Sequence, residues 1–268
     1  MPRSLWNGTI AFGQVNVPVK LYSAVQSKTV SFRQVHLADG ARIEQRRFCT
    51  AEDQEIPYAE VVKGFEVSPD EYVVLSEDEV KAAAGRRTKI IDVEHFIPVA
   101  DIDPVFFDRT YFLGAQDEGA EAYRLLHDAL KKTGRAAAGR FVFHNREYLA
   151  AIRSLDGVLA LHTMRYADEV VSGDDVDIPD LSRGPTQREI DMAAQLVEGI
   201  HEDFDAEQYN DDYREAVLSL IEAKAAGEEV DVQAEDEQEE DTDLAAALQA
   251  SLKATQDRHS RGKAKATA

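Results

Sequence analysis

The stretch Leu5–Ala24, with the sequence LWNGTIAFGQVNVPVKLYSA, has three positions that an ordinary β-strand lacks. β-branched and aromatic residues surround two single glycines, Gly8 and Gly13, and Pro18 lies within the apolar run that ends at Lys20. A glycine inside a strand marks a bulge or the close approach of another backbone, and a proline restricts its segment to an edge or a bend. The stretch therefore predicts strand structure with specific packing at these positions.

Residues 1–170 are predicted to be mostly β-strands, because apolar and polar residues alternate along several segments. Two pairs of such segments are joined by Asp-Gly, which is typical of a tight hairpin turn. The first hairpin, with its turn at Asp39, pairs Val30–Leu37 with Ala41–Thr50, and the second, with its turn at Asp156, pairs Phe141–Leu155 with Val158–Tyr166.

Two helices are predicted within this β-rich part of the chain. The first begins with the capping box Ser76–Glu79 and stops at Gly85. The second, Glu121–Thr133, has two lysines in its last turn and ends before Gly134, as helix C-termini commonly do. One face of this helix carries Tyr123, Leu126, Ala129 and Leu130.

After residue 170 the pattern changes from strands to a connector and helices. Gly, Pro and Asp are frequent in residues 170–186, which indicates a connector. A capping box at Thr186–Glu189 opens a helix whose apolar residues recur at spacings of three and four, and a second helix ends at Gly227. An amphipathic pair of helices attached to a β domain usually packs on its own domain, and this is the first alternative for residues 186–227.

The C-terminal part of the chain has too few apolar residues for a folded core. Residues 228–243 contain 10 Asp and Glu in 16 positions, which predicts a disordered spacer. Residues 243–255 place three leucines on one helical stripe, and a helix this short needs a partner to be stable. We expect it to dock on another protein; the alternative is that it packs back on its own domain.

The net charge of −21 argues at first against DNA binding, because phosphate contacts require clustered Lys and Arg. The charge is unevenly distributed, however. Residues 1–50 contain 7 Lys and Arg against 2 Asp and Glu, and residues 121–166 contain 8 against 4. Residues 167–250 contain 4 against 27. The acidity either only solubilises the protein or leaves basic strands to line one surface.

Composition also limits the compartment and the chemistry. No apolar run reaches the roughly 18 residues that span a bilayer, and the N-terminus lacks the apolar core of a signal peptide. The histidines are scattered, and none pairs with the single cysteine, Cys49, at a metal-ligand spacing. An enzyme would have to use acidic pairs such as Asp101/Asp103 or Asp174/Asp175, which an acidic chain supplies by chance. We therefore expect a cytoplasmic protein with no catalytic residue, metal or cofactor.

The N-terminal stretch resembles the signature of the bacterial Ku family. The resemblance continues through residues 92–113 and 209–224 and covers about residues 3–225. Some members of the family carry a second cysteine near the position of Cys49, and its absence here argues against a zinc site. The residues that match the signature are Trp6, Gly8, Ile10, Phe12, Gly13, Val15, Val17, Pro18, Val19 and Lys20.

This resemblance implies a mixed, β-dominated fold, with a Ku-type β-barrel core and a helical C-terminal arm, assembled as a ring-shaped homodimer. It implies sequence-independent binding of double-stranded DNA ends in non-homologous end joining, in the cytoplasm at the nucleoid, with recruitment and stimulation of the ATP-dependent DNA ligase D. Residues 1–170 would encircle DNA, 171–227 would form the connector and helical dimerisation arm, and 228–268 would hold the acidic spacer, the ligase-docking helix 243–255 and a short basic tail.

Binding that ignores sequence requires contacts to sugar and phosphate, so the candidate residues are Lys and Arg on strands and hairpin loops. Along the run that contains Arg42, Arg46 and Arg47, side chains alternate, so not all three can face DNA. The DNA-binding candidates are Lys20, Arg33, Arg42, Arg46, Arg47, Arg86, Arg87, Lys89, Arg135, Arg140, Arg146 and Arg153. The expected dimerisation residues are Ile190, Val197, Ile200, Phe204, Tyr213, Val217 and Leu220, and the expected ligase-docking residues are Leu244, Leu248 and Leu252.

The alternative function is an acidic protein-interaction scaffold without direct DNA binding. A mobility-shift measurement on blunt linear DNA at moderate salt distinguishes the two functions.

Overall fold

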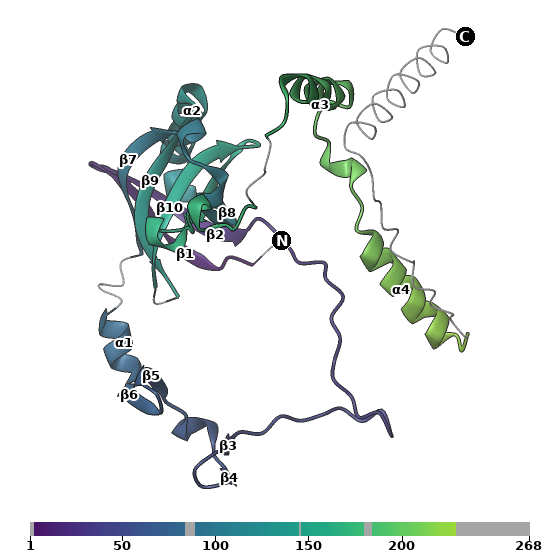
Figure 1. Ribbon diagram of the computed structural model, residues 1–268. Coiled ribbons are helices and arrows are strands. Elements are labelled where there is room, and N and C mark those ends of the chain that lie inside the picture. The colour runs from purple at the N-terminus through teal and green to yellow at the C-terminus, as the bar shows by residue number, and fades with distance from the viewer. Residues whose placement is uncertain (1–2, 84–88, 145, 180–183, 229–268) are drawn as a thin grey trace. The chain divides into compact units, whose positions relative to one another are not determined.

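The computed structural model of this chain describes residues 3–83, 89–144, 146–179 and 184–228. It divides into two compact units, residues 1–28 with 32–176 and residues 29–31 with 177–268. The first unit contains a closed β-barrel with a long insertion between two of its strands, and the described residues of the second include the α-helices α3 and α4 (Figure 1). None of the helices in the described ranges is long and apolar enough to span a membrane.

Seven strands close into a barrel in the order β1-β2-β8-β11-β10-β9-β7. Neighbouring strands run antiparallel except for β1 and β7, which are parallel. Closure gives every barrel strand two neighbours and confirms the predicted β-dominated fold with a barrel core. The strands are β1 (Trp6–Phe12), β2 (Val15–Ser23), β7 (Ile90–Pro98), β8 (Phe107–Ala115), β9 (Arg135–Phe143), β10 (Arg146–Leu155) and β11 (Val158–Met164), and one helix, α2 (Ala120–Thr133), packs on them.

The N-terminal stretch forms β1, β2 and the tight turn between them. Gly13, in this turn, has a φ of +57°, a conformation that favours glycine. A Cβ at Gly8 would lie 2.4 Å from the backbone oxygen of Lys89, so β7 can approach β1 this closely only at a glycine. Pro18 lies opposite Thr9 of β1. The N–H of Thr9 points to the other side and donates to the backbone oxygen of Lys89 at 2.8 Å. Strand packing therefore accounts for the three special positions.

Helix α2 completes the core of the barrel. Leu126 and Leu130 are buried among the interior side chains of the strands, as predicted. Ala129 lies on the same face of the helix and is exposed. His127 is buried instead, and its Nε2 lies 2.9 Å from the hydroxyl of Ser154 on β10. A polar partner on the barrel thus allows a histidine on the inner face of the helix, which apolar spacing alone does not indicate.

The hairpin predicted at Asp156 is confirmed between β10 and β11. Asp156 and Gly157 have φ angles of +47° and +84°, as this kind of two-residue turn requires. The predicted strand Phe141–Leu155 is wrong in its extent, because the chain reverses at His144, with a φ of +50°, and continues as β10. Apolar residues continue on both sides of this turn without a glycine or proline to mark it.

Residues 24–89, here called the insertion, connect β2 to β7 and form only small local elements. The turn predicted at Asp39 is present, since the Asp39 carboxylate accepts from the Ala41 N–H at 2.9 Å. The strands predicted on either side of it are wrong, because one isolated bridge, between Val35 and Arg42, takes their place. Alternation alone does not make a strand where no sheet covers the apolar face, and Leu37 is fully exposed.

The rest of the insertion contains two short hairpins and a helix. The capping box is confirmed, because the Ser76 N–H donates to the Glu79 carboxylate at 2.8 Å, while the predicted helix end at Gly85 lies outside the described residues. The elements are β3 (Phe48–Cys49) paired with β4 (Gln54–Glu55), β5 (Lys63–Ser68) paired with β6 (Glu71–Leu75), and α1 (Glu77–Ala83).

The second unit contains α3 (Gln187–Gly199) and α4 (Asp212–Ala225). The predicted capping box is confirmed, since the Thr186 N–H donates to a carboxylate oxygen three residues later at 2.6 Å. Phe204 is not on α3, contrary to the periodic pattern, and its ring stacks on Tyr209 with centroids 5.7 Å apart. The acidic residues that follow Gly199 would oppose the dipole of a longer helix at its C-terminus.

Candidate nucleic-acid interface

Both connections of the insertion leave the barrel at the same end. β2 ends there at Ser23, and β7 begins there at Ile90, which pairs with Thr9 of the parallel strand β1. The strand register places the start of β8, the end of β9, the start of β10 and the end of β11 at this end as well. It is called the insertion end below. Arg135, at the start of β9, lies at the opposite end.

A hollow of about 300 Å³ opens at the insertion end. Two guanidinium side chains, Arg109 and Arg146, contribute to its wall together with His144. The Arg109 side chain is 75% exposed, and its Nε lies 4.0 Å from the Asp108 carboxylate. Two arginines presented to solvent around one hollow are suited to binding an anion such as a phosphate.

Arg146 is held in place by neighbours on two sides. Its Nη2 donates to the carboxylate of Glu169 at 3.0 Å, and its guanidinium carbon lies 5.4 Å from the centre of the Tyr148 ring. The N–H of Tyr166 also donates to Glu169, and this bond, with the contact to Arg146, holds the pKa of Glu169 below its usual value. Glu169 is therefore a charged partner that orients Arg146 while 60% of the arginine side chain stays exposed.

Two arginines at this end are absent from the sequence-based candidates. Arg109 lies in a predominantly acidic part of the chain, and Arg165 follows β11 directly. Arg165 donates to the carbonyl oxygens of Val105, at 2.8 Å, and of Phe107. These bonds hold the end of β11 against the start of β8. The pairing of β8 with β11 places both arginines at the insertion end, and no local sequence signal predicts that pairing.

The predicted barrel cations do not form one continuous surface. The Nε of Arg140, near the insertion end, lies 3.4 Å from a carboxylate oxygen of Glu94 on β7. Lys89 precedes β7 at the same end. Lys20 alternates with buried residues of β2 and therefore faces away from the barrel interior. Arg135 is separated from these residues by the length of the barrel.

Arg153 on β10 has a structural partner. Its Nε donates to Nε2 of His162 at 2.9 Å, so the His162 proton lies on Nδ1, 3.0 Å from the hydroxyl of Thr110. Burial, and then the positive charge of Arg153, lower the pKa of His162 to about 4. His162 is therefore neutral at physiological pH and accepts the hydrogen bond that orients Arg153.

The predicted cations of the insertion that the structure describes are exposed, and two of them have defined contacts. Arg46 lies 3.1 Å from Glu55, while the guanidinium carbon of Arg47 lies 4.8 Å from the centre of the Tyr58 ring. Different neighbours thus hold these two side chains. Of the remaining candidates, Arg33 and Arg42 are exposed, and Arg86 and Arg87 lie outside the described residues.

The expected dimerisation residues lie on α3, on α4 and between them. Most are exposed within their own unit, where Phe204 reaches 81%. Ile190, Val197, Ile200 and Tyr213 are also exposed, Val217 and Leu220 are half-buried, and the expected ligase-docking residues Leu244, Leu248 and Leu252 lie outside the described residues.

Within the described ranges, no three His, Cys, Asp or Glu side chains are grouped so that they could hold a metal ion. The Asp103 carboxylate accepts from the Val105 N–H at 2.9 Å and caps a short turn. Cys49 is half-buried and not in a disulfide. Asp103 thus has a local structural role.

Comparisons with known proteins agree with this architecture. The family model of the Ku70/Ku80 beta-barrel domain matches residues 11–192. A non-homologous end joining protein Ku of Anaeromyxobacter sp. (strain K) is 44% identical over 260 residues, covering 96% of this chain and 88% of the relative. The protein of that name from Opitutus terrae is 37% identical over 222 residues, covering 83% and 80%. The one from Mycobacterium tuberculosis H37Rv is 36% identical over 263 residues, covering 94% and 95%.

Proposed function

The chain belongs to the Ku family, and from this membership we propose that it binds double-stranded DNA ends during non-homologous end joining. It would act as a threaded homodimeric ring and as a scaffold rather than an enzyme, with no cofactor, in the cytoplasm at the nucleoid. The barrel and insertion would hold DNA, the helical unit would serve in dimerisation, and the region after residue 228 would recruit the ligase.

The observation that carries this proposal is the placement of Arg109 and Arg146 at the insertion end of the barrel. A duplex enclosed between the insertion and this end would meet exposed guanidinium groups, with Arg140 and Lys89 nearby. Contacts of this kind neutralise phosphates without reading bases, which suits a protein that must accept any DNA end. Lys20, Arg33, Arg42 and Arg47 remain proposed contributors to the same lining.

Dimerisation is supported by apolar side chains that the chain leaves uncovered. In the hairpin of β5 and β6, Phe65, Tyr72 and Val74 are each more than half exposed. On and after α3, Val197 and Phe204 are exposed as well. Large apolar side chains left exposed on both faces of a hairpin favour an interaction site, and a second copy would supply a self-complementary cover. Two insertions and two barrels would then close the ring.

The leucines of residues 243–255 are proposed to dock on the ATP-dependent DNA ligase D. Their spacing of four places them on one face of a helix, and the acidic spacer before them extends by self-repulsion, which increases its reach. The deletion of residues 243–255 should abolish stimulation of the ligase while end binding is retained. Loss of DNA binding in this deletion would contradict the division of labour.

Competition between DNA topologies tests the ring directly. Labelled linear duplex is bound by the full chain, and unlabelled competitor is added either as the same duplex in linear form or as a relaxed circle. A closed ring loads only at free ends, so we expect the circle to compete poorly. Equal competition by circles would contradict threading, and no binding to either form would favour the acidic scaffold.

A further inference from the structure

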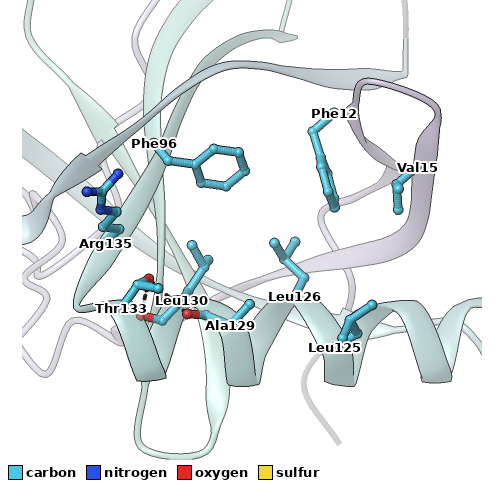
Figure 2. A pocket seen from close by; sticks show the side chains of 9 residues that line it. All are labelled: Phe12, Val15, Phe96, Leu125, Leu126, Ala129, Leu130, Thr133 and Arg135. Atoms are coloured by element: carbon cyan, nitrogen blue, oxygen red, sulfur yellow. Dashed lines mark hydrogen bonds between the residues drawn. The ribbon is translucent and has the colours of Figure 1, made fainter.

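An apolar groove of about 660 Å³ lies between α2 and the turn that joins β1 to β2 (Figure 2). Leu126 and Leu130 of α2 line one side, and Phe12 and Phe96 face them from the strands with ring centroids 6.0 Å apart. Leu125, which also lines the groove, is 68% exposed. All of these residues belong to the barrel unit. The volume and the apolar lining are those of a pocket that binds a ligand.

The groove opens where β1 and β7 separate. The two strands pair over three residues of each, and the last pair is Ala11 with Asp92. β1 ends one residue later, whereas β7 continues to Pro98 beside β9. The register of β7 shifts between Val93 and His95, and a bulge of this kind bends a strand and terminates pairing. Among the described residues, the last part of β7 therefore has a strand partner on one side only.

The other side of β7 residues 95–97 is a short strand edge. Such an edge presents backbone N–H and C=O groups that pair with another chain. Phe96, which is 40% exposed, belongs to this part of β7 and also lines the groove. An extended segment on this edge would direct every second side chain toward the groove. The edge and the groove together fit a strand better than a helix, because the backbone groups of a helix are already paired within it.

One end of the groove carries positive charge without a carboxylate partner. Arg135 lines this end, and Lys131 and Lys132 precede it in the last turn of α2. All three side chains are exposed, and within the described ranges none of them is in an ion pair. In a chain with a net charge of −21, three unpaired cations beside one apolar groove favour an acidic ligand.

We propose that the groove binds a short extended segment of another protein, in which large apolar residues alternate with polar ones and an Asp or Glu follows. The segment would add a strand to the edge of β7, with its apolar side chains between Leu126 and Phe96. Arg135 lies opposite Pro98 in the pairing of β9 with β7, so the carboxylate would lie at the C-terminal end of β7. Main-chain pairing would supply affinity, and the apolar alternation with the terminal acid would supply specificity.

The groove lies at the other end of the barrel from the surface proposed to hold DNA. Arg135 is at the end opposite Arg109 and Arg146. The barrel could therefore hold a partner segment and a duplex at the same time. This docking goes beyond the proposed function and does not depend on it.

A displayed library of short random peptides, selected on the full chain and counter-selected on Leu125→Glu, tests the ligand chemistry. Leu125 is mostly exposed, so this substitution should leave the core intact. We expect enriched sequences with large apolar residues at alternate positions and Asp or Glu at one end. No enrichment over the counter-selection, or enriched sequences with helical spacing or basic ends, would overturn the proposal.

Fluorescence anisotropy with the most enriched peptide tests the contacts. Leu125→Glu and Arg135→Glu should each weaken binding about tenfold or more. Leu37→Glu, at a fully exposed leucine outside the groove, is the matched control and should bind as the native chain does. A peptide in which lysine replaces the acidic residue should regain affinity for Arg135→Glu. Equal binding to the native chain and to both groove variants would contradict docking in the groove.

Hydrogen–deuterium exchange with the same peptide tests the addition of a strand. Amides of residues 95–97 that do not pair with β9 should exchange at least about tenfold more slowly when the peptide is bound. Unchanged exchange there would overturn strand addition, and peptide binding that appears only on dilution would assign the groove to a second copy instead. Leu125→Glu should still bind a linear duplex like the native chain, so failure of this docking and failure of DNA binding are distinguishable.

Discussion

The barrel and the insertion both contain alternating apolar and polar residues, yet the apolar side chains are buried in the barrel and exposed in the insertion. In the barrel, Ile10, Val19 and Leu161 are completely buried, whereas every residue of β5 and β6 is exposed. The barrel closes on itself and receives α2 as a cover. The insertion hairpin has two strands and no cover among the described residues of its own unit, and two strands alone are marginally stable in water. The same pattern therefore encodes a self-sufficient core in one region and an interface in the other.

Truncation of one leucine in each region should show this difference most strongly. Leu161→Ala, in the barrel core, should lower the free energy of unfolding by about 2–5 kcal/mol, because it leaves a cavity in a closed core. Leu75→Ala, on β6, should change it by less than about 1 kcal/mol when subunit association is held constant. Urea unfolding measures both values. Equal losses of unfolding free energy would contradict the difference between a closed core and an uncovered hairpin.

Glycine positions provide the next test. Gly8→Ala should destabilise the barrel by about 1–3 kcal/mol, since the added Cβ would lie 2.4 Å from the Lys89 backbone oxygen and must push β7 away. The control is Gly173→Ala, where no atom lies within 4 Å of the added Cβ. Urea unfolding of the two variants side by side checks this prediction, and a stable Gly8→Ala protein would show that β1 and β7 can separate without cost.

The fold could be predicted from the sequence where a single residue type, such as glycine or proline, restricts the local backbone conformation. Gly8, Pro18 and the turn at Asp156 were identified from the residue types themselves, and the structure gives each a packing or turn role. The turn at His144 and the absence of strands beside Asp39 could not be predicted. Both depend on which distant segment is available to pair, and alternation does not encode that choice.

Stability should depend on pH in the barrel through His162. Burial and Arg153 lower its pKa from about 6.5 to about 4, so unfolding at intermediate pH takes up a proton. The stabilising contribution is complete above pH 6.5 and is lost as the pH falls toward 4. Between pH 7.5 and 5 the native chain should lose about 1–2 kcal/mol more than His162→Gln does in urea unfolding. His95→Gln, at an exposed histidine of β7, should behave like the native chain.

Replacing cations shows whether the barrel or the insertion holds phosphates. Arg109→Gln with Arg146→Gln should lower the affinity for a linear duplex about tenfold or more and reduce the slope of log K against log salt by about 0.9 per contact. Arg33→Gln with Arg42→Gln tests the insertion in the same assay. Arg124→Gln, on the exposed face of α2, is the control with one charge removed. Unchanged affinity and slope in the barrel pair would exclude the insertion end as the phosphate site.

The candidate site was less predictable than the fold. Arg146 and Arg140 could be identified because they lie in basic, strand-rich sequence, but Arg109 lies among acidic residues and becomes a candidate only through its neighbours in space. Arg153 was identified by its charge, yet His162 orients it and a sequence does not reveal that contact. Charge composition therefore finds cations but not the surface on which they meet.

Native mass measurement with and without a short linear duplex tests the threaded homodimeric ring. We expect a particle of two chains alone and a particle of two chains with one duplex when DNA is added. The same protein should give no such complex with a small closed circle. A chain that stays monomeric both alone and on linear DNA would contradict the account, because the apolar surfaces of the insertion and helices would then have no second copy to cover them.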